Sequence, residues 1–222
     1  MLNLESNYQK VKSAIASAAE RVGRDPLSVQ LVAVTKTVGI ETVQAAFSLG
    51  MADFGENRVQ DAVEKVTALP EANWHFIGHL QSNKVKDVLP SFKLIHSLDR
   101  RSLAVALQKW AKKMNLEVSV LIQVNVSGEK SKFGLAPQEL PEYLKYLCTL
   151  DRIKPCGLMT MAPYVDHAEQ VRPFFRHLRQ LRDLHSEDLP GLRELSMGMT
   201  NDYQVAVEEG ATIVRIGSAI FS

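Results

Sequence analysis

Short apolar runs alternate along the chain with longer stretches in which apolar residues recur three and four positions apart. Within 101–114, for example, Leu103, Leu107 and Trp110 share one side of an expected helix. The runs expected to form strands are 31–35, 52–55, 74–78, 94–97, 118–126, 153–159, 192–197 and 212–216. Several are apolar at almost every position, which is typical of strands covered on both faces of a parallel sheet. The pattern therefore predicts repeated strand–helix units.

Eight such units predict a TIM-type (β/α)8 barrel, which belongs to the α/β class. An extra helix, roughly Leu4 to Val22 within residues 1–25, precedes the first strand, and Gly23 and Pro26 mark its end. Because such barrels need about 250 residues, the chain is expected to form one domain over 1–222, with the N-terminal helix packed on the barrel. An open doubly wound sheet is the competing architecture, but its Gly-x-Gly-x-x-Gly signature does not occur.

Composition and charge narrow the class of function. The chain is 45% apolar and 23% charged, which fits a folded globular protein rather than a disordered one. A net charge of +1 provides no overall basic field for nucleic acid or a membrane surface. No signal peptide or long apolar run is present, so we expect a cytoplasmic protein without a membrane partner. Cys148 and Cys156 are too few for a disulfide framework and are expected to be buried thiols.

In a TIM barrel, functional groups gather at the carboxyl ends of the strands. The first strand ends in Val34-Thr35-Lys36-Thr37, which places a primary amine at the mouth of the barrel. An unprotonated lysine attacks carbonyl carbons to form a Schiff base, and burial beside another cation would lower its pKa toward the useful range. The alternative is a strand-end lysine whose stem packs while its ammonium reaches water. Lys36 by itself does not separate these two interpretations.

The loops after the last two strands carry a more specific signal, because these loops commonly form a phosphate site in the fold. The seventh strand continues as 196–202, in which Gly198 permits close backbone approach and Thr200 or Asn201 can cap a helix. The eighth strand ends in Arg215-Ile216-Gly217-Ser218, with a second glycine and hydroxyl. Either segment alone is typical of a plain turn. Together they indicate a ligand that carries a phosphate.

Arg215 shares its strand face with Gly217, whereas Val214 and Ile216 point to the opposite face. An arginine within such a strand needs a partner. That partner is either a carboxylate of a neighbouring element or, if the residue is functional, a ring nitrogen or acid group of a ligand. The residue pattern leaves both open.

Other polar residues favour structural roles. His75 and His79 have the spacing of helical zinc ligands, but Gly78 between them argues against a shared helical face, so no metal site is expected. The loop 125–134 is expected to form a flexible rim of the barrel mouth. Arginines at helical spacing, expected to face water beside acidic residues rather than nucleic acid, are Arg172, Arg176, Arg179 and Arg182.

Five short segments of the chain, taken together, form a specific combination of motifs. The segments are Ala33-Val34-Thr35-Lys36, Phe54-Gly55-Glu56-Asn57, Trp74-His75-Phe76-Ile77-Gly78, Ser196-Met197-Gly198-Met199 and Val214-Arg215-Ile216-Gly217. Over nearly its whole length, the chain resembles the pyridoxal phosphate homeostasis protein family. The resemblance implies a single-domain barrel that is similar to the N-terminal domain of alanine racemase and lacks the second, β-rich domain of that enzyme.

The resemblance also implies roles for individual residues. Lys36 would hold pyridoxal 5′-phosphate (PLP) as a Schiff base, and Asn57 would line the ring pocket. Arg215 matches the family arginine that faces the pyridine nitrogen, where a fixed cation disfavours ring protonation and weakens the cofactor as an electron sink. The phosphate would lie against the segments 196–200 and 217–218. The full cofactor-binding set is Lys36, Asn57, Ser196, Gly198, Met199, Thr200, Arg215, Gly217 and Ser218, with no catalytic residue.

The function that this resemblance implies is PLP binding in intracellular vitamin B6 homeostasis, without substantial catalysis. Its partners would be PLP and recipient PLP-dependent enzymes, and a monomer is expected because the domain that helps to build the racemase dimer is absent. A racemase needs a second acid or base on the opposite face of the substrate carbon. The alternatives are a PLP-dependent amino-acid racemase or lyase of low activity, or a barrel enzyme that binds a phosphorylated metabolite without covalent attachment.

Overall fold

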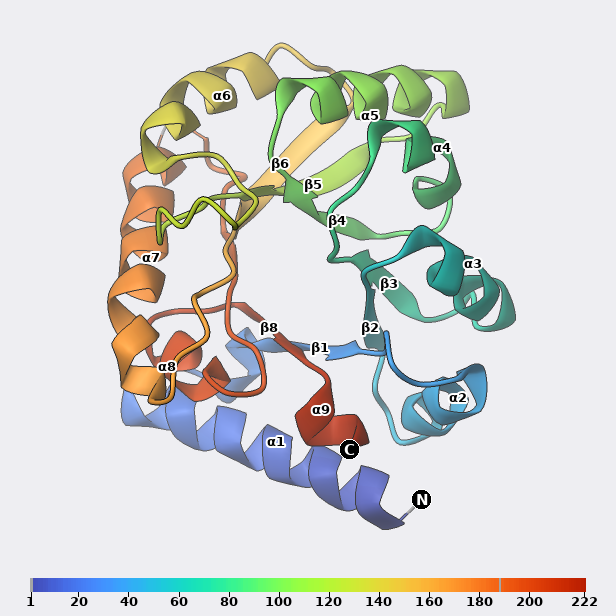
Figure 1. Cartoon of the computed structure of the whole chain (residues 1–222), viewed down its shortest axis with the longest axis vertical. Helices are drawn as coiled ribbons and strands as arrows, with labels where there is room; N and C mark the ends of the chain where they lie inside the picture. The colour runs from blue at the N-terminus through green and yellow to red at the C-terminus, as the bar shows by residue number, and fades with distance from the viewer. Residues whose placement is uncertain (1, 188) are drawn as a thin grey trace.

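In the computed structural model, which describes residues 2–187 and 189–222, parallel strands close into a barrel in the order β1 to β8 (Figure 1). The strands are β1 (Gln30–Val34), β2 (Asp53–Glu56), β3 (Asn73–Phe76), β4 (Leu94–Leu98), β5 (Val118–Gln123), β6 (Ile153–Met159), β7 (Glu194–Ser196) and β8 (Ile213–Ile216). Pairing of β1 with β8, in which Leu31 lies opposite Val214, closes the ring. The predicted TIM-type barrel is confirmed, and every apolar run expected to form a strand overlaps one.

Helices cover the outside of the barrel (Figure 1). They are α2 (Ile40–Ser48), α3 (Val59–Ala68), α4 (Val85–Val88), α5 (Arg101–Met114), α6 (Leu140–Leu147), α7 (Arg172–Ser186), α8 (Tyr203–Glu208) and α9 (Ser218–Phe221). Four short 3-10 turns in the described residues are η1 (Pro26–Ser28), η2 (Ser82–Lys84), η3 (Pro137–Glu139) and η4 (Ala168–Val171). Helix α5 is followed by Asn115 as its C-terminal cap, whose φ of 52° is the left-handed conformation that commonly terminates a helix.

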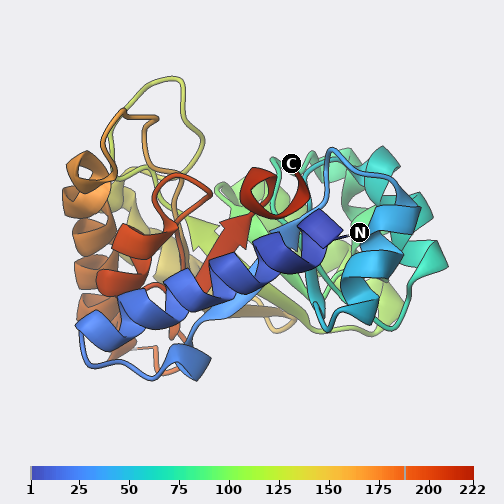
Figure 2. The same ribbon diagram turned by 90° about the horizontal axis from the view of Figure 1, so that it is seen from below.

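The predicted N-terminal helix is confirmed as α1 (Leu2–Arg21), which packs beside α8 and α9 near the other end of the sequence (Figure 2). Its buried side chains recur at intervals of mostly three or four positions and form one apolar stripe. They are Tyr8, Val11, Ile15, Ala18 and Ala19. The amide of Asn7 donates to the backbone carbonyl oxygen of Ile220 at 3.3 Å. The two ends of the chain are therefore joined on the barrel surface.

The sheet separates two parts of the core. Outside the strands, apolar side chains such as Phe54 and Trp74 pack against the helices. Inside the barrel, a smaller apolar cluster consists of Val32, Leu94, Leu121, Met159 and Ile213. Two residues further along three of these strands, the interior side chains are His96, Gln123 and Arg215. Because barrel interiors are usually filled by branched apolar residues, this buried polar layer points to the carboxyl end as the functional end.

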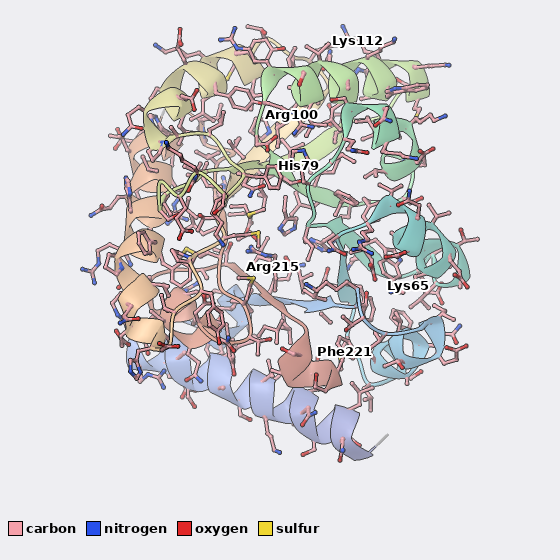
Figure 3. All side chains as sticks on the ribbon, in the orientation of Figure 1. Lys65, His79, Arg100, Lys112, Arg215 and Phe221 are labelled. Carbon is pink, nitrogen blue, oxygen red and sulfur yellow. The ribbon has the colours of Figure 1, made fainter. Side chains whose placement is uncertain are left out.

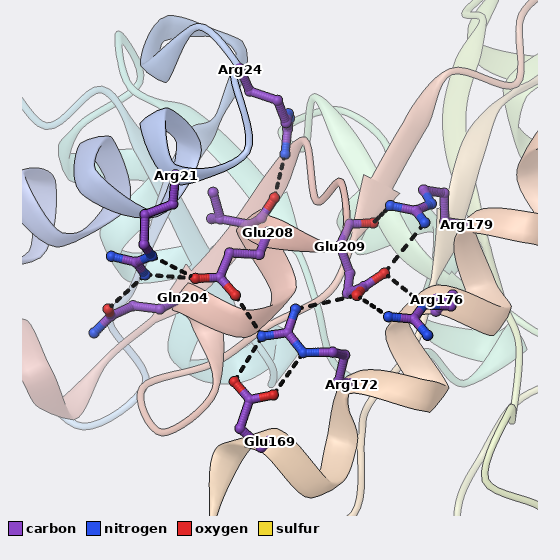
Figure 4. Close-up of polar contacts among 10 residues, drawn as sticks. Arg21, Arg24, Glu169, Arg172, Arg176, Arg179, Gln204, Glu208 and Glu209 are labelled. Atoms are coloured by element: carbon purple, nitrogen blue, oxygen red, sulfur yellow. Dashed lines mark hydrogen bonds and ion pairs between the residues drawn. The ribbon is translucent and has the colours of Figure 1, made fainter.

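The predicted arginine stripe lies on α7, where Arg172, Arg176 and Arg179 bind acidic side chains of neighbouring elements (Figure 4). Arg182 instead pairs with Asp183, the next residue of the same helix. Arg172 donates to Glu208 at 2.5 Å and to Glu209 at 3.2 Å. The Glu209 carboxylate, which is only 4% exposed, also accepts from Arg176 at 2.9 Å. From α1, Arg21 donates to Glu208 at 2.8 Å. The network therefore ties α1, α7 and α8 together.

Glu209→Gln is expected to lower the free energy of unfolding by about 2 kcal/mol, because the α7 guanidinium groups lose their buried counter-charge. Burial alone would raise the pKa of Glu209, but hydrogen bonds from Arg176 and Arg172 outweigh burial and hold the pKa below its ordinary value of 4.5. The stabilising charge is therefore present above that ordinary value and is lost as the pH falls below it. Urea unfolding from neutral to acidic pH measures both effects. A variant as acid-sensitive as the wild type would contradict this assignment.

The two cysteines are more exposed to solvent than the sequence predicted. Cys148 is exposed at the end of α6, and Cys156 on β6 is partly exposed. The prediction that both are buried is wrong, because apolar neighbours in the sequence do not show on which side of an element a single residue lies. Of the helices in the described part of the chain, none is both long and apolar enough to cross a lipid bilayer.

Candidate functional site

A cavity of about 890 Å³ opens at the carboxyl ends of the strands. The loops after β5 and β6, residues 124–136 and 160–167, rise on the same side of the barrel as α9 (Figure 2). Most residues of the predicted cofactor-binding set line this cavity, namely Lys36, Asn57, Met199, Thr200, Arg215, Gly217 and Ser218. Closure of the barrel brings these residues together, because they belong to β1, β2, β7, β8 and the segments that follow them.

Lys36 follows β1, and its exposed side chain forms part of the cavity wall. Val34, two residues earlier, lines the same cavity, as the alternation of a strand requires. Between them, Thr35 donates its N–H to the Gly55 carbonyl oxygen at 3.1 Å and accepts from Lys65 Nζ at 2.7 Å. The backbone that bears the amine is therefore fixed, while the amine reaches the open cavity. This exposure at the cavity fits both interpretations of Lys36.

A buried ion pair lies behind this strand end, between β2 and α3. Lys65 Nζ donates to Glu56 Oε1 at 2.7 Å, and the Thr35 hydroxyl donates to the same oxygen at 2.5 Å. Glu56 is fully buried and Lys65 is 7% exposed; Figure 3 shows Lys65 on the barrel's outer side. Within the described residues, Glu56 Oε2 is buried without a hydrogen-bond partner. Sequence reasoning missed Lys65, because a lysine on an amphipathic helix ordinarily faces water.

Arg215 projects from β8 into the centre of the barrel, where it reaches the cavity (Figure 3). It is 4% exposed, and it donates from Nη1 to Ser196 Oγ at 2.5 Å and from Nη2 to the Thr160 carbonyl oxygen at 2.9 Å. Burial lowers the pKa of Arg215 to about 10, and the charge of Asp202 opposes this decrease. The guanidinium thus stays charged at neutral pH. Since these two acceptors are neutral oxygens, its positive charge is available to a ligand.

The loops after β7 and β8 meet at the side of the cavity. The Ser218 hydroxyl donates to Thr200 Oγ1 at 3.2 Å, which joins the two segments predicted to hold a phosphate. The Met199 N–H is bound to the Asp202 carboxylate at 2.6 Å, so this amide is already occupied. Gly217 lies close to β1, where a Cβ would stand 3.2 Å from a backbone carbonyl oxygen. Two hydroxyl groups and a closely packed glycine therefore border the cavity here.

Ser196 and Gly198, which complete the predicted set, lie just behind the residues that line the cavity. Ser196 is fully buried, and its Oγ is shared by His96 Nδ1 at 2.9 Å and by Arg215. Gly198 has a φ of 93°, and a Cβ there would lie 2.6 Å from the Cβ of Ala206 on α8. The structure thus places Ser196 beneath Arg215, while glycine at 198 lets the loop approach α8.

The cavity is also lined by residues that the sequence did not single out as ligand contacts. Lys132 and Phe133, from the loop expected to form a rim, line the cavity. The Phe133 ring stacks on His79, with ring centroids 4.1 Å apart. Tyr164, in the loop after β6, lines the same cavity and is 82% exposed. In the sequence, the aromatic residue Phe133 within the largely polar loop 125–134 could have indicated this part of the cavity wall.

The two histidines that have the spacing of zinc ligands lie in different environments. His75 is buried and contacts Asp53 and His96, whereas His79 lies at the cavity, 3.5 Å from Asp99. Across residues 2–187 and 189–222, no group of three or more histidine, cysteine, aspartate or glutamate side chains is arranged to hold a metal ion.

The chemistry of the cavity follows from its three kinds of polar group. A primary amine condenses with an aldehyde, and hydroxyl groups bind phosphate oxygens through hydrogen bonds. A buried, fixed cation attracts a lone pair or a negatively charged group of a ligand. A ligand with an aldehyde, a phosphate and a basic ring nitrogen would match Lys36, the Thr200–Ser218 side and Arg215 respectively.

The family model for the N-terminal domain of alanine racemase matches residues 3–222. A pyridoxal phosphate homeostasis protein of Aquifex aeolicus (strain VF5) is 46% identical over 223 residues, covering 99% of this chain and 98% of that protein.

Two solved structures are similar at comparable identity. An unknown protein from Bifidobacterium adolescentis has a TM-score of 0.94 and 38% identity, covering 99% of this chain and 94% of that one. PipY of Synechococcus elongatus PCC7942, solved with PLP bound, has a TM-score of 0.83 and 35% identity, covering 96% of this chain and 100% of that one. With such identity along almost its entire length, the chain belongs to the pyridoxal phosphate homeostasis protein family.

Proposed function

We propose that this chain binds PLP covalently through Lys36 and serves intracellular PLP homeostasis without substantial catalysis. The observation that carries the proposal is the exposed Lys36 amine in the same cavity as the buried Arg215 guanidinium. Supporting it, the Aquifex aeolicus relative bears the name of a homeostasis protein, and PipY was solved with PLP bound.

The residues present fit each part of this cofactor. The Lys36 nitrogen would attack the aldehyde carbon, and a C=N bond would form as the aldehyde oxygen leaves in a water molecule. The hydroxyl groups of Thr200 and Ser218, at the loops after β7 and β8, would hold the phosphate. Asn57 lines the cavity between β2 and α3 and would flank the ring.

Arg215 is the reason to expect little catalysis. Bound PLP supplies an electron sink for carbanion chemistry, and that sink is strongest when the ring nitrogen is protonated. A fixed guanidinium opposite this nitrogen disfavours the additional positive charge. Because Arg215 is buried and held by Ser196 and Thr160, it has little freedom to move away. The site therefore suits retention of the cofactor better than demanding carbanion chemistry.

Arg215→Glu is expected to favour protonation of the ring nitrogen and to shift the absorption maximum of bound PLP, since a carboxylate stabilises the charge that arginine opposes. Absorption spectra of the loaded protein measure the shift, and Arg215→Gln provides a neutral variant in case the buried glutamate prevents folding. Arg101→Glu, an exposed change on α5, serves as the control and should leave the spectrum unchanged. Unchanged spectra and affinity in both Arg215 variants would place this arginine outside the ring pocket.

The proposal as a whole is tested by absorbance and intact mass of the purified protein with added PLP, before and after borohydride reduction. One reduced cofactor bound per chain is expected, and peptide mapping should place it on Lys36. No adduct after reduction would remove the covalent proposal. Transfer of PLP from the loaded protein to apo forms of PLP-dependent enzymes would test the recipients, and light scattering would test the proposed monomer.

A low-activity racemase or lyase is the second candidate, because the chain matches the N-terminal domain of alanine racemase over residues 3–222. Exchange of the α-hydrogen of amino acids for deuterium measures this activity directly. Exchange at background level is expected. Rapid turnover that depends on Lys36 would replace the binding function with a catalytic one.

A further inference from the structure

A line of hydrogen-bonded side chains crosses the barrel interior beneath Arg215. Ser196 Oγ, which accepts from Arg215, lies 2.9 Å from His96 Nδ1. His96 Nε2 lies 3.0 Å from His75 Nδ1, and His75 Nε2 lies 3.2 Å from Asp53 Oδ1. Ser196 and His96 are fully buried and His75 is 2% exposed, whereas the Asp53 side chain is 17% exposed at the start of β2. The line thus runs from the cavity toward the amino end of the barrel.

The chemistry of the end groups sets a direction along this line. A guanidinium only donates and a carboxylate only accepts. Because Ser196 accepts from Arg215, its own hydroxyl proton is free to be donated to His96 Nδ1. His96 then carries its proton on Nε2 and donates to His75 Nδ1. His75 in turn donates from Nε2 to Asp53, so that every donor in the line has an acceptor.

The opposite direction is less favourable. If His96 donated from Nδ1, Ser196 Oγ would accept from both His96 and Arg215, and its hydroxyl proton would lose its partner in the line. An unmatched donor at a fully buried position is costly. Charged histidine is also disfavoured at the centre, because burial lowers the pKa of His96 well below its ordinary value and the charge of Arg215 lowers it further. Two neutral imidazoles that donate in the same direction satisfy these requirements.

We propose that Ser196, His96, His75 and Asp53 form a one-way hydrogen-bond chain that positions the Arg215 guanidinium toward the ring nitrogen of bound PLP. The ligand part of this inference rests on the proposed function, whereas the chain is a property of the protein alone. Fixed tautomers keep the lone pair of Ser196 Oγ, rather than its proton, facing Arg215. This accounts for the buried polar side chain of His96 at an interior position that a branched apolar residue would fill in other barrels.

Substitutions at His96 distinguish positioning from packing. His96→Gln keeps one acceptor and one donor in a neutral side chain, whereas His96→Leu removes both. Leu121→Ala is the matched control, because Leu121 is fully buried in the apolar cluster inside the barrel but lies outside the chain. Asp53→Ala is the second test variant in case His96→Leu does not fold, since Asp53 is the partly exposed end of the line.

The first measurement uses the unloaded protein and is independent of PLP. Nitrogen-15 spectra of the imidazole rings should show His75 and His96 neutral, each with its proton on Nε2 and none on Nδ1. Asp53→Ala should shift the ring signals of His75, and Ser196→Ala those of His96. A cationic His96, or a proton on its Nδ1, would overturn the proposed direction.

The second measurement uses PLP labelled with nitrogen-15 in its ring. His96→Leu should shift the ring-nitrogen signal and raise the dissociation constant about tenfold, whereas His96→Gln and Leu121→Ala should resemble the wild type in both. A wild-type signal in both His96→Leu and Asp53→Ala would overturn the positioning role. If the wild-type protein bound no PLP, the proposed function would fail, while the imidazole spectra would still decide whether the chain exists.

Discussion

Lys36→Ala is expected to abolish the visible absorbance that arises when PLP binds, and borohydride should no longer attach the cofactor to the protein. The Schiff base needs a primary amine, and alanine provides none. The barrel should fold with stability near that of the wild type, because Lys36 is exposed while its neighbour Thr35 makes the contacts to β2 and α3. Absorption spectra, intact mass and urea unfolding measure these three outcomes.

The control for this experiment is Lys132→Ala, since Lys132 also lines the cavity. It should retain both the absorbance and an adduct that peptide mapping locates at Lys36. Equilibrium dialysis of Lys36→Ala measures the noncovalent affinity that the rest of the cavity, including Arg215, Thr200 and Ser218, provides without the amine. An adduct that survived in Lys36→Ala but disappeared in Lys132→Ala would identify Lys132 as the nucleophile.

Lys65→Met should lower the free energy of unfolding by about 3–5 kcal/mol, which is the usual loss when one member of a buried ion pair is removed. Among the residues that the structure describes, the substitution leaves the fully buried Glu56 carboxylate with only the Thr35 hydroxyl as a donor. It also removes one of two donors to the Thr35 carbonyl oxygen, next to Lys36: the Lys65 contact at 2.7 Å is lost, and that of the Val38 N–H at 3.1 Å stays. Urea unfolding of the unloaded protein measures the loss. PLP affinity should fall as well, because the backbone before the reactive amine loses a contact.

Two further variants make this prediction specific to burial. Lys112→Met removes an ion pair of 3.1 Å with Asp151, but both side chains are more than half exposed, so no measurable loss of stability is expected. The double variant Glu56→Leu with Lys65→Met removes both charges and should recover much of the stability lost in Lys65→Met. Equal losses in Lys65→Met and Lys112→Met would show that the contacts of Lys65 contribute no more than a surface pair.

Much of the site could be predicted, because its residues stand at recognisable places in the strand pattern. Lys36 comes at the end of an apolar run, and Arg215 interrupts another, so alternation alone gives the face of each side chain. Neither Lys65 nor His96 stands at a position in the sequence pattern that would single it out as part of the site. The role of a lysine on an amphipathic helix, or of a histidine in a strand, depends on the side chain that it contacts. For Lys65 that side chain is Glu56, which belongs to another element.

By itself, the sequence determined the barrel, its N-terminal helix and the candidate amine, because hydrophobic periodicity and strand ends are local features of the chain. The tertiary structure alone decided which polar groups face one another. Ser196 and His96 are separated by 100 positions and share a hydrogen bond of 2.9 Å, because closure of the sheet directs side chains of separate strands into one narrow interior. No local sequence pattern predicts that hydrogen bond, since the distance between two strands across a barrel depends on the curvature of the whole sheet.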